Sequence, residues 1–205
     1  WGKDIWKTPL TDEEKEKRLK KHDDFYRVTH ALMTRLEKKF GSIIVFDVHS
    51  FNYRRIEKET PVFNIGTEKI DNEKYGKYVN YFIRELSKIT LPNIDVRVSE
   101  NEVFFGRGYL LEYITKNFNA LVLATEIKKI YCNELSGENY PLIIERLTHR
   151  LKRAIVNTAA NFARSNTSLT VKRNNSLLSS ELESSLIRVD KAFFDLAKDF
   201  EILKY

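Results

Sequence analysis

Hydrophobic residues recur along this chain at two spacings, which predict alternating helices and strands. In residues 11–40 a highly charged start is followed by apolar side chains at helical spacing, and Thr11 with Glu14 makes a capping-box pattern. We therefore expect one long helix that Gly41 ends. Residues 42–50 and 119–127 are short, apolar, β-branched runs, which is typical of strands buried on both faces.

The remaining pattern continues the alternation. Amphipathic or apolar spacing predicts helices over residues 71–89, 108–118 and 141–165, and shorter strands over residues 62–66 and 94–100. Strands and helices that alternate through about residue 166 predict an α/β fold with a mainly parallel sheet flanked by helices.

The end of the chain has a different pattern. Residues 167–180 are rich in Ser and Asn and low in charge, and we expect a linker there. Residues 181–205 repeat apolar side chains at helical spacing and predict an amphipathic helix, which packs on the first domain or begins a following one. Because the chain starts at Trp1 and its single methionine is Met33, we expect the sequence to be a piece of a longer chain.

Composition narrows the class of protein. The chain has 205 residues, of which 42% are hydrophobic and 31% charged, and this excludes disorder as the main state. Apolar runs stay well short of the ~20 residues that span a bilayer. The single Cys132 agrees with a reducing compartment, so we expect a cytoplasmic protein without membrane contact.

The charge balance raises one rival function. A net charge of +6 and a pI of about 9.2 suit a nucleic-acid-binding module. The basic residues, however, alternate with acidic ones along the helices, and the aromatic residues fall at core spacing. The pattern therefore does not favour a nucleic-acid partner.

Polar side chains follow the two buried strands, where ligand sites of α/β sheets collect. Asp47 and His49 are two residues apart and point to the same face of a strand, which suits an imidazole with an acidic neighbour. Glu126 ends the second strand and could act as a general base. The alternative for the first pair is a carboxylate that caps a turn beside a satisfied, half-buried histidine.

Other basic residues lie near these strands in the sequence. Instead of acting as a general base, Glu126 could form a structural ion pair with one of these Lys or Arg residues. Arg107 lies between two glycines and could bind a carboxylate, or simply belong to a turn before a helix. Arg54 follows the first strand, beside the candidate site or in a solvated loop.

Four segments in order, VFDVHSFNYRR, VFNIGT, FFGRGYL and ATEIKKIYCNE, resemble the N-formylglutamate amidohydrolase family. The resemblance implies a fold similar to zinc-dependent carboxypeptidases and deacylases, and hydrolysis of an amide next to a carboxylate-bearing amino acid. It covers about residues 1–163, and it implies that residues 1–166 are the later, C-terminal portion of a larger hydrolase domain. It implies that His49 is a zinc ligand, that Glu126 is the general acid/base, and that Asp47 supports His49.

The resemblance also implies substrate contacts. Arg107 and Asn64 fall on the segments that would bind the substrate, although the family more often has glycine at the position of Arg107. Family members carry a further zinc ligand upstream of the point where this chain begins, so we expect these residues to hold half of a site. A degenerate domain kept for interaction is the alternative, because a catalytic zinc takes three protein ligands.

Overall fold

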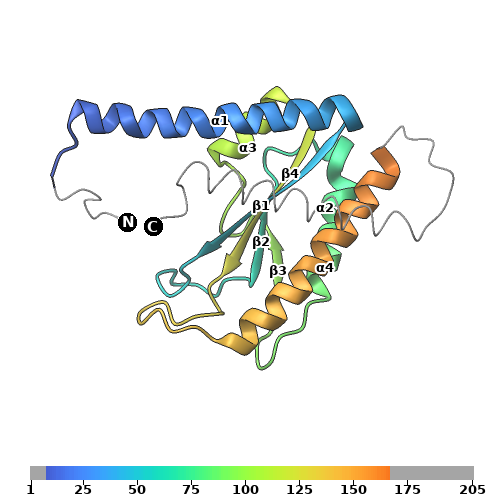
Figure 1. Cartoon of the computed structure of the whole chain (residues 1–205). Coiled ribbons are helices and arrows are strands. Elements are labelled where there is room, and N and C mark those ends of the chain that lie inside the picture. Colours follow the sequence, from blue (N-terminus) through green and yellow to red (C-terminus); the bar gives the residue numbers. More distant parts are fainter. Residues whose placement is uncertain (1–7, 167–205) are drawn as a thin grey trace.

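The computed structural model describes residues 8–166, so the predicted linker and the predicted helix over residues 181–205 lie outside the described residues. The elements in chain order are α1 (Asp12–Phe40), β1 (Ile43–Phe51), β2 (Phe63–Gly66), α2 (Asn72–Ser87), β3 (Val98–Glu100), α3 (Tyr109–Asn117), β4 (Ala120–Lys128) and α4 (Pro141–Asn166). Figure 1 shows them coloured along the chain.

The four described strands form one sheet in the order β1-β4-β2-β3. β1 pairs with β4 in parallel, and β2 pairs with β3 in parallel, whereas β2 runs antiparallel to β4. The prediction of a mainly parallel sheet flanked by helices is therefore confirmed, with one antiparallel pairing at its centre.

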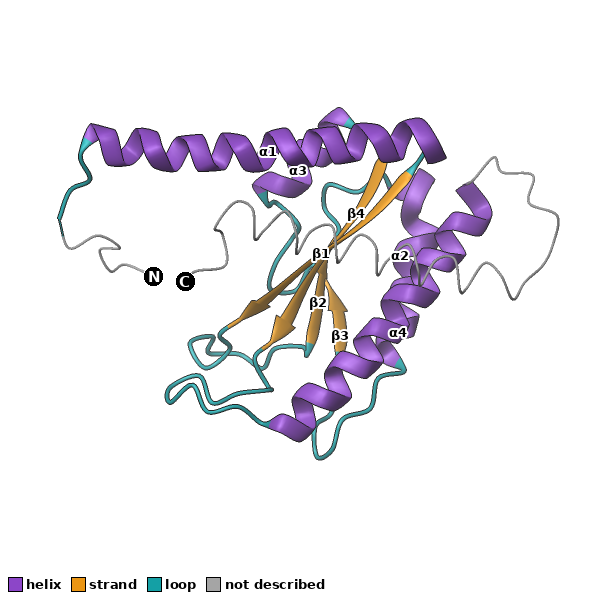
Figure 2. Ribbon diagram, viewed as in Figure 1, coloured by secondary structure: helices purple, strands orange, loops and turns teal. Residues whose placement is uncertain are grey.

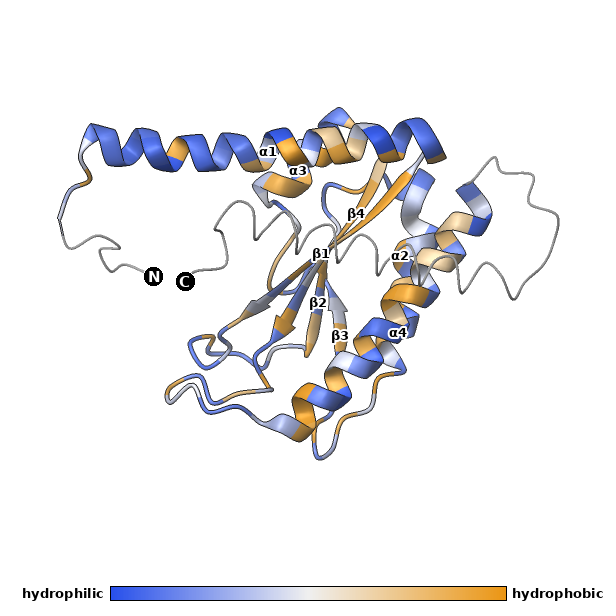
Figure 3. Ribbon diagram, in the orientation of Figure 1, coloured by the Kyte–Doolittle hydropathy of each residue, from blue (hydrophilic) through white to orange (hydrophobic). Residues whose placement is uncertain are grey.

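Helices cover both faces of the sheet (Figure 2). Along β4 the side chains alternate between the faces, as the pleat requires. Ala120 and Val122 pack with residues of α1 and α3. Leu121 and Leu123 pack with residues of α2 and α4. Colouring by hydropathy shows apolar residues along the strands and a mostly polar outer surface on α1 (Figure 3).

The long helix α1 begins and ends as the sequence predicts. The Thr11 side chain accepts a hydrogen bond from the Glu14 amide, and the Glu14 carboxylate accepts from the Thr11 amide in return. Gly41 ends the helix with φ of 76°, in the left-handed region that favours glycine. Met33 is the residue of α1 that is fully buried, which anchors the second half of the helix to the sheet.

One strand differs in length from the sequence prediction. The strand predicted over residues 94–100 is shorter, because β2 has only four residues and offers partners to Val98–Glu100 alone. Within residues 8–166, none of the helices is long and apolar enough to cross a membrane.

Candidate functional site

The register of the sheet brings four predicted site residues to one face. His49 of β1 lies opposite Glu126 of β4, and Glu126 lies opposite Asn64 of β2. Asp47 is two residues before His49 and shares its face. This is the face that α1 and α3 cover further along β1 and β4, since Val45 and Ala124 pack there.

Asp47 and His49 are hydrogen-bonded to each other. The distance between His49 Nε2 and Asp47 Oδ1 is 2.8 Å. Because an ionised carboxylate only accepts hydrogen bonds, we assign the Nε2 proton to this bond, which leaves a lone pair on Nδ1 of the neutral ring. The His49 side chain is 58% exposed and the Asp47 side chain 13% exposed, so the imidazole is accessible while its carboxylate partner is shielded.

Glu126 lies half-buried between the two neighbouring strands. Burial raises the pKa of its carboxyl group, the charge of Asp47 raises it further, and His49 opposes both effects. A carboxyl group with a raised pKa is a stronger base than an ordinary glutamate, which suits the transfer of a proton.

Asn64 is fully buried, and its side chain holds a loop against this face. Its Oδ1 accepts hydrogen bonds from the amides of Glu102 (3.1 Å) and Val103 (2.8 Å). Its Nδ2 donates to the Phe104 carbonyl at 2.7 Å. The Phe104 ring packs on Phe51, the last residue of β1, with ring centroids 5.2 Å apart, so the loop lies against the end of that strand.

The two candidate arginines have different surroundings. Arg107 donates from Nε (2.9 Å) and Nη2 (2.5 Å) to one carboxylate oxygen of Glu68. Arg54 is exposed, and its amide donates to the Glu134 carboxylate at 3.3 Å, as does the Tyr53 amide at 2.6 Å. Whether Asn64, Arg54 or Arg107 contacts a substrate stays a prediction.

Sequence reasoning missed Glu68 and Glu134, which hold these segments. Glu68 is 39 residues from Arg107 and Glu134 is 80 residues from Arg54. Partners so far apart, both in loops, leave no periodic signal in a single sequence.

Sequence reasoning also missed a group of aromatic rings between α1 and α3. The Tyr26 ring lies 5.2 Å from Tyr109 and 4.7 Å from Tyr113, measured between ring centroids. Burial raises the pKa of the Tyr26 hydroxyl, with smaller contributions from Tyr109 and from the charge of Asp47. These rings therefore stand on the side of the site that α1 and α3 cover.

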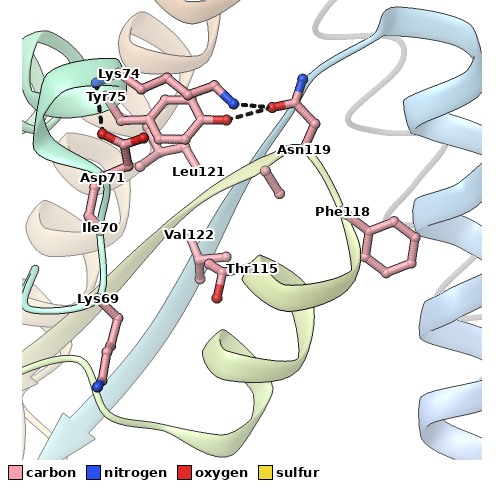
Figure 4. A pocket seen from close by; sticks show the side chains of 11 residues that line it. Lys69, Ile70, Asp71, Lys74, Tyr75, Thr115, Phe118, Asn119, Leu121 and Val122 are labelled. Atoms are coloured by element: carbon pink, nitrogen blue, oxygen red, sulfur yellow. Dashed lines mark hydrogen bonds between the residues drawn. The ribbon is translucent and has the colours of Figure 1, made fainter.

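Two hollows lie elsewhere on the described part of the chain. One, of about 200 Å³, lies between the start of α2, the end of α3 and the start of β4. Figure 4 shows that Lys74 and the Tyr75 hydroxyl there both meet the side-chain oxygen of Asn119, at 2.6 and 2.9 Å. The other, of about 560 Å³, is lined by residues of α4. Neither hollow is lined by Asp47, His49 or Glu126, and we call the face that carries these three residues the shelf.

The metal-ligating side chains on this face are fewer than a catalytic zinc requires. Over residues 8–166, no group of three or more His, Cys, Asp or Glu side chains is arranged to hold a metal ion. The shelf offers Nδ1 of His49 and the Glu126 carboxylate, whereas a catalytic zinc takes three protein ligands. The described residues therefore do not form a zinc site by themselves.

Comparisons with known proteins identify the family of the chain. The family model described as N-formylglutamate amidohydrolase matches residues 1–131. No curated protein matches the chain.

A crystal structure of N-formylglutamate amidohydrolase from Ralstonia eutropha JMP134 has a similar fold, with a TM-score of 0.51 and 22% sequence identity. The match covers 78% of this chain and 59% of that one, so this chain spans less than two thirds of that protein's length. The expected likeness to zinc carboxypeptidases stays a prediction. From the family-model match over residues 1–131, we conclude that the chain belongs to the N-formylglutamate amidohydrolase family.

Proposed function

We propose that the protein hydrolyses the amide bond of an N-acylated amino acid of the N-formylglutamate type, on the shelf formed by Asp47, His49 and Glu126. The observation that carries the proposal is the pairing of Glu126 with His49 in register on one face, with burial raising the pKa of the glutamate. Family membership supports the reaction class.

Glu126 has the properties of the group that moves the proton. As a carboxylate it accepts a proton from a water molecule, and as a carboxylic acid it donates that proton to the leaving amine. Its raised pKa makes the carboxylate a stronger base than an ordinary glutamate. Asp47 fixes the orientation and the tautomer of the His49 ring through the 2.8 Å hydrogen bond.

Arg107 and Arg54 are the candidate anchors for the substrate carboxylate. A guanidinium offers a planar fork of N–H donors that matches a carboxylate. Arg107 is the stronger candidate, because its loop is fixed to the face of the sheet that carries Glu126.

Zinc dependence is a separate proposal, which rests on the family resemblance, with His49 as the candidate ligand. We expect the full-length protein to contain zinc that is lost in His49→Ala and kept in Glu126→Gln, as measured by elemental analysis. Unchanged zinc content in His49→Ala would remove the ligand role from His49.

The reaction itself is tested by incubating the full-length protein with N-formylglutamate and measuring the formate and glutamate released. N-formylglutamine and N-formylleucine serve as companion substrates that keep the amide and alter the side chain. We expect release from N-formylglutamate to be the fastest. Absence of release from all three, with zinc and other divalent ions supplied, contradicts the proposal.

A further inference from the structure

The ion pair between Arg107 and Glu68 joins the loop that follows β2 to the loop that precedes α3. Arg107 directs two donors, Nε and Nη2, to the same Glu68 atom, Oε2, at 2.9 and 2.5 Å. The two side chains are 64% and 37% exposed. Both donors of one guanidinium edge therefore use a single carboxylate oxygen, whereas a matched pair would use two.

The backbone around this pair is fixed on the face that carries Glu126. Gly66 lies opposite Ala124 of β4, two residues before Glu126. A Cβ added to Gly66 would lie 2.2 Å from the Gly106 nitrogen, so Gly106 rests directly on the sheet. The Arg107 guanidinium therefore extends from a segment that is in contact with this face.

Further hydrogen bonds hold both partners of the ion pair in place at the main chain. The Glu68 amide donates to the Phe105 carbonyl at 3.1 Å. The Thr67 amide donates to the Asn101 side chain at 2.8 Å. Hydrogen bonds hold both backbones, and both side chains are partly exposed to water. The Arg107 guanidinium can therefore exchange Glu68 for another carboxylate without a movement of the loop.

We propose that Glu68 is an internal competitor for Arg107, which a substrate carboxylate displaces, so that Glu68 sets how strongly the site selects carboxylate-bearing substrates. This inference rests on the proposed function and assigns a role to a residue that the function itself does not need. The exchange replaces one carboxylate by another, so the charge on Arg107 stays balanced throughout.

The geometry of the Arg107–Glu68 pair allows a substrate carboxylate to bind the guanidinium more favourably than Glu68 does. A free carboxylate can approach the guanidinium with both oxygens and make two parallel hydrogen bonds, which the single-oxygen contact of Glu68 does not. The hydrogen bond between them lowers the pKa of Glu68 and raises that of Arg107, so both groups are charged when the substrate arrives. A substrate without a carboxylate has no means of displacing Glu68.

The test uses Glu68→Gln, which removes the charge and keeps the side-chain size. We expect the KM for N-formylglutamate to fall about two- to fivefold, the range set by a partly exposed ion pair, with kcat unchanged. Arg107→Ala should raise the same KM. Glu112→Gln is the matched control, because it removes one exposed carboxylate that pairs with Lys116 instead, and should leave KM unchanged. A KM that rises or stays unchanged in Glu68→Gln overturns the proposal.

A binding measurement separates this proposal from the proposed function. The ¹⁵N-labelled Nε–H signal of Arg107 is followed by NMR while N-formylglutamate is added to the full-length protein. A shift of that signal in the absence of hydrolysis supports the displacement and rejects the reaction. Hydrolysis without a shift rejects the displacement and leaves the reaction in place, and absence of both rejects both.

Discussion

At the scale of single residues, Glu126 shows how position sets chemistry. The carboxyl group ends a strand that is otherwise apolar, so it is partly removed from water and its pKa rises. The neighbouring Asp47 adds to that effect, and His49 reduces it without reversing it. Burial therefore decides the direction of the shift.

This shift predicts a cost in stability. The pKa of Glu126 is raised in the folded state above its ordinary value of 4.5, so folding favours the protonated form. The destabilisation is absent below pH 4.5 and complete above the folded pKa. We expect the unfolding free energy of Glu126→Gln to exceed that of the wild type at pH 7 and to equal it at pH 4, in chemical denaturation without metal ions. A variant that is less stable at pH 7 would contradict this.

Glu102 gives the opposite pH dependence. Arg97 donates hydrogen bonds to both of its oxygens, at 2.5 and 2.9 Å, and lowers its pKa from 4.5 to about 2. The stabilisation is therefore present above pH 4.5 and is lost as the pH falls toward 2. Because water screens this partly exposed pair, we expect Glu102→Gln to lose about 1 kcal/mol or less at pH 7.

The control for this prediction is Glu57→Gln, an exposed residue of the loop between β1 and β2. Acid titration of the unfolding free energy should give a flatter curve between pH 4.5 and 2 for Glu102→Gln than for the wild type or the control. Identical curves for all three proteins would show that the ion pair does not stabilise the fold.

The same scale shows what a sequence can predict about a site. Strand alternation predicts that Asp47 and His49 share a face, and the end of an apolar run predicts where the Glu126 side chain leaves the core. The partner of Arg107 could not be predicted, because Glu68 reaches it only after β2 and the loop before α3 have packed together.

At the scale of elements, signals within a few residues of one another were the reliable ones. Thr11 with Glu14 and the glycine at position 41 predicted both ends of α1, since caps depend on residues in direct sequence proximity. The length of β3 could not be predicted in this way, because it is set by the length of its neighbour β2.

The contact between β2 and the loop before α3 predicts a sensitive position. Gly66→Ala places a Cβ 2.2 Å from a backbone nitrogen that cannot rotate away. We expect a loss of about 1–3 kcal/mol in unfolding free energy, the usual cost of overpacking, measured by urea denaturation. Gly108→Ala is the control, since its Cβ meets no atom within 4 Å, and it should lose less. Equal losses in both variants would contradict the close contact.

At the scale of the whole molecule, the alternation of strands and helices along the sequence predicts the fold class. It does not predict the direction in which β2 runs. All four residues of β2 are buried, so their hydrophobic pattern is the same for a parallel and an antiparallel neighbour. The antiparallel pairing of β2 with β4 matters for the site, because it places the start of β2, with Asn64, beside the end of β4, with Glu126.

We propose that the amide bond is cleaved on the shelf that carries Asp47, His49 and Glu126, with Glu126 moving the proton. The most direct measurement is the rate of formate release from N-formylglutamate by the full-length wild type and by Glu126→Gln. We predict a fall in kcat of about 10²- to 10⁴-fold in a variant that remains folded. A folded Glu126→Gln variant that releases formate at the wild-type rate would contradict the account.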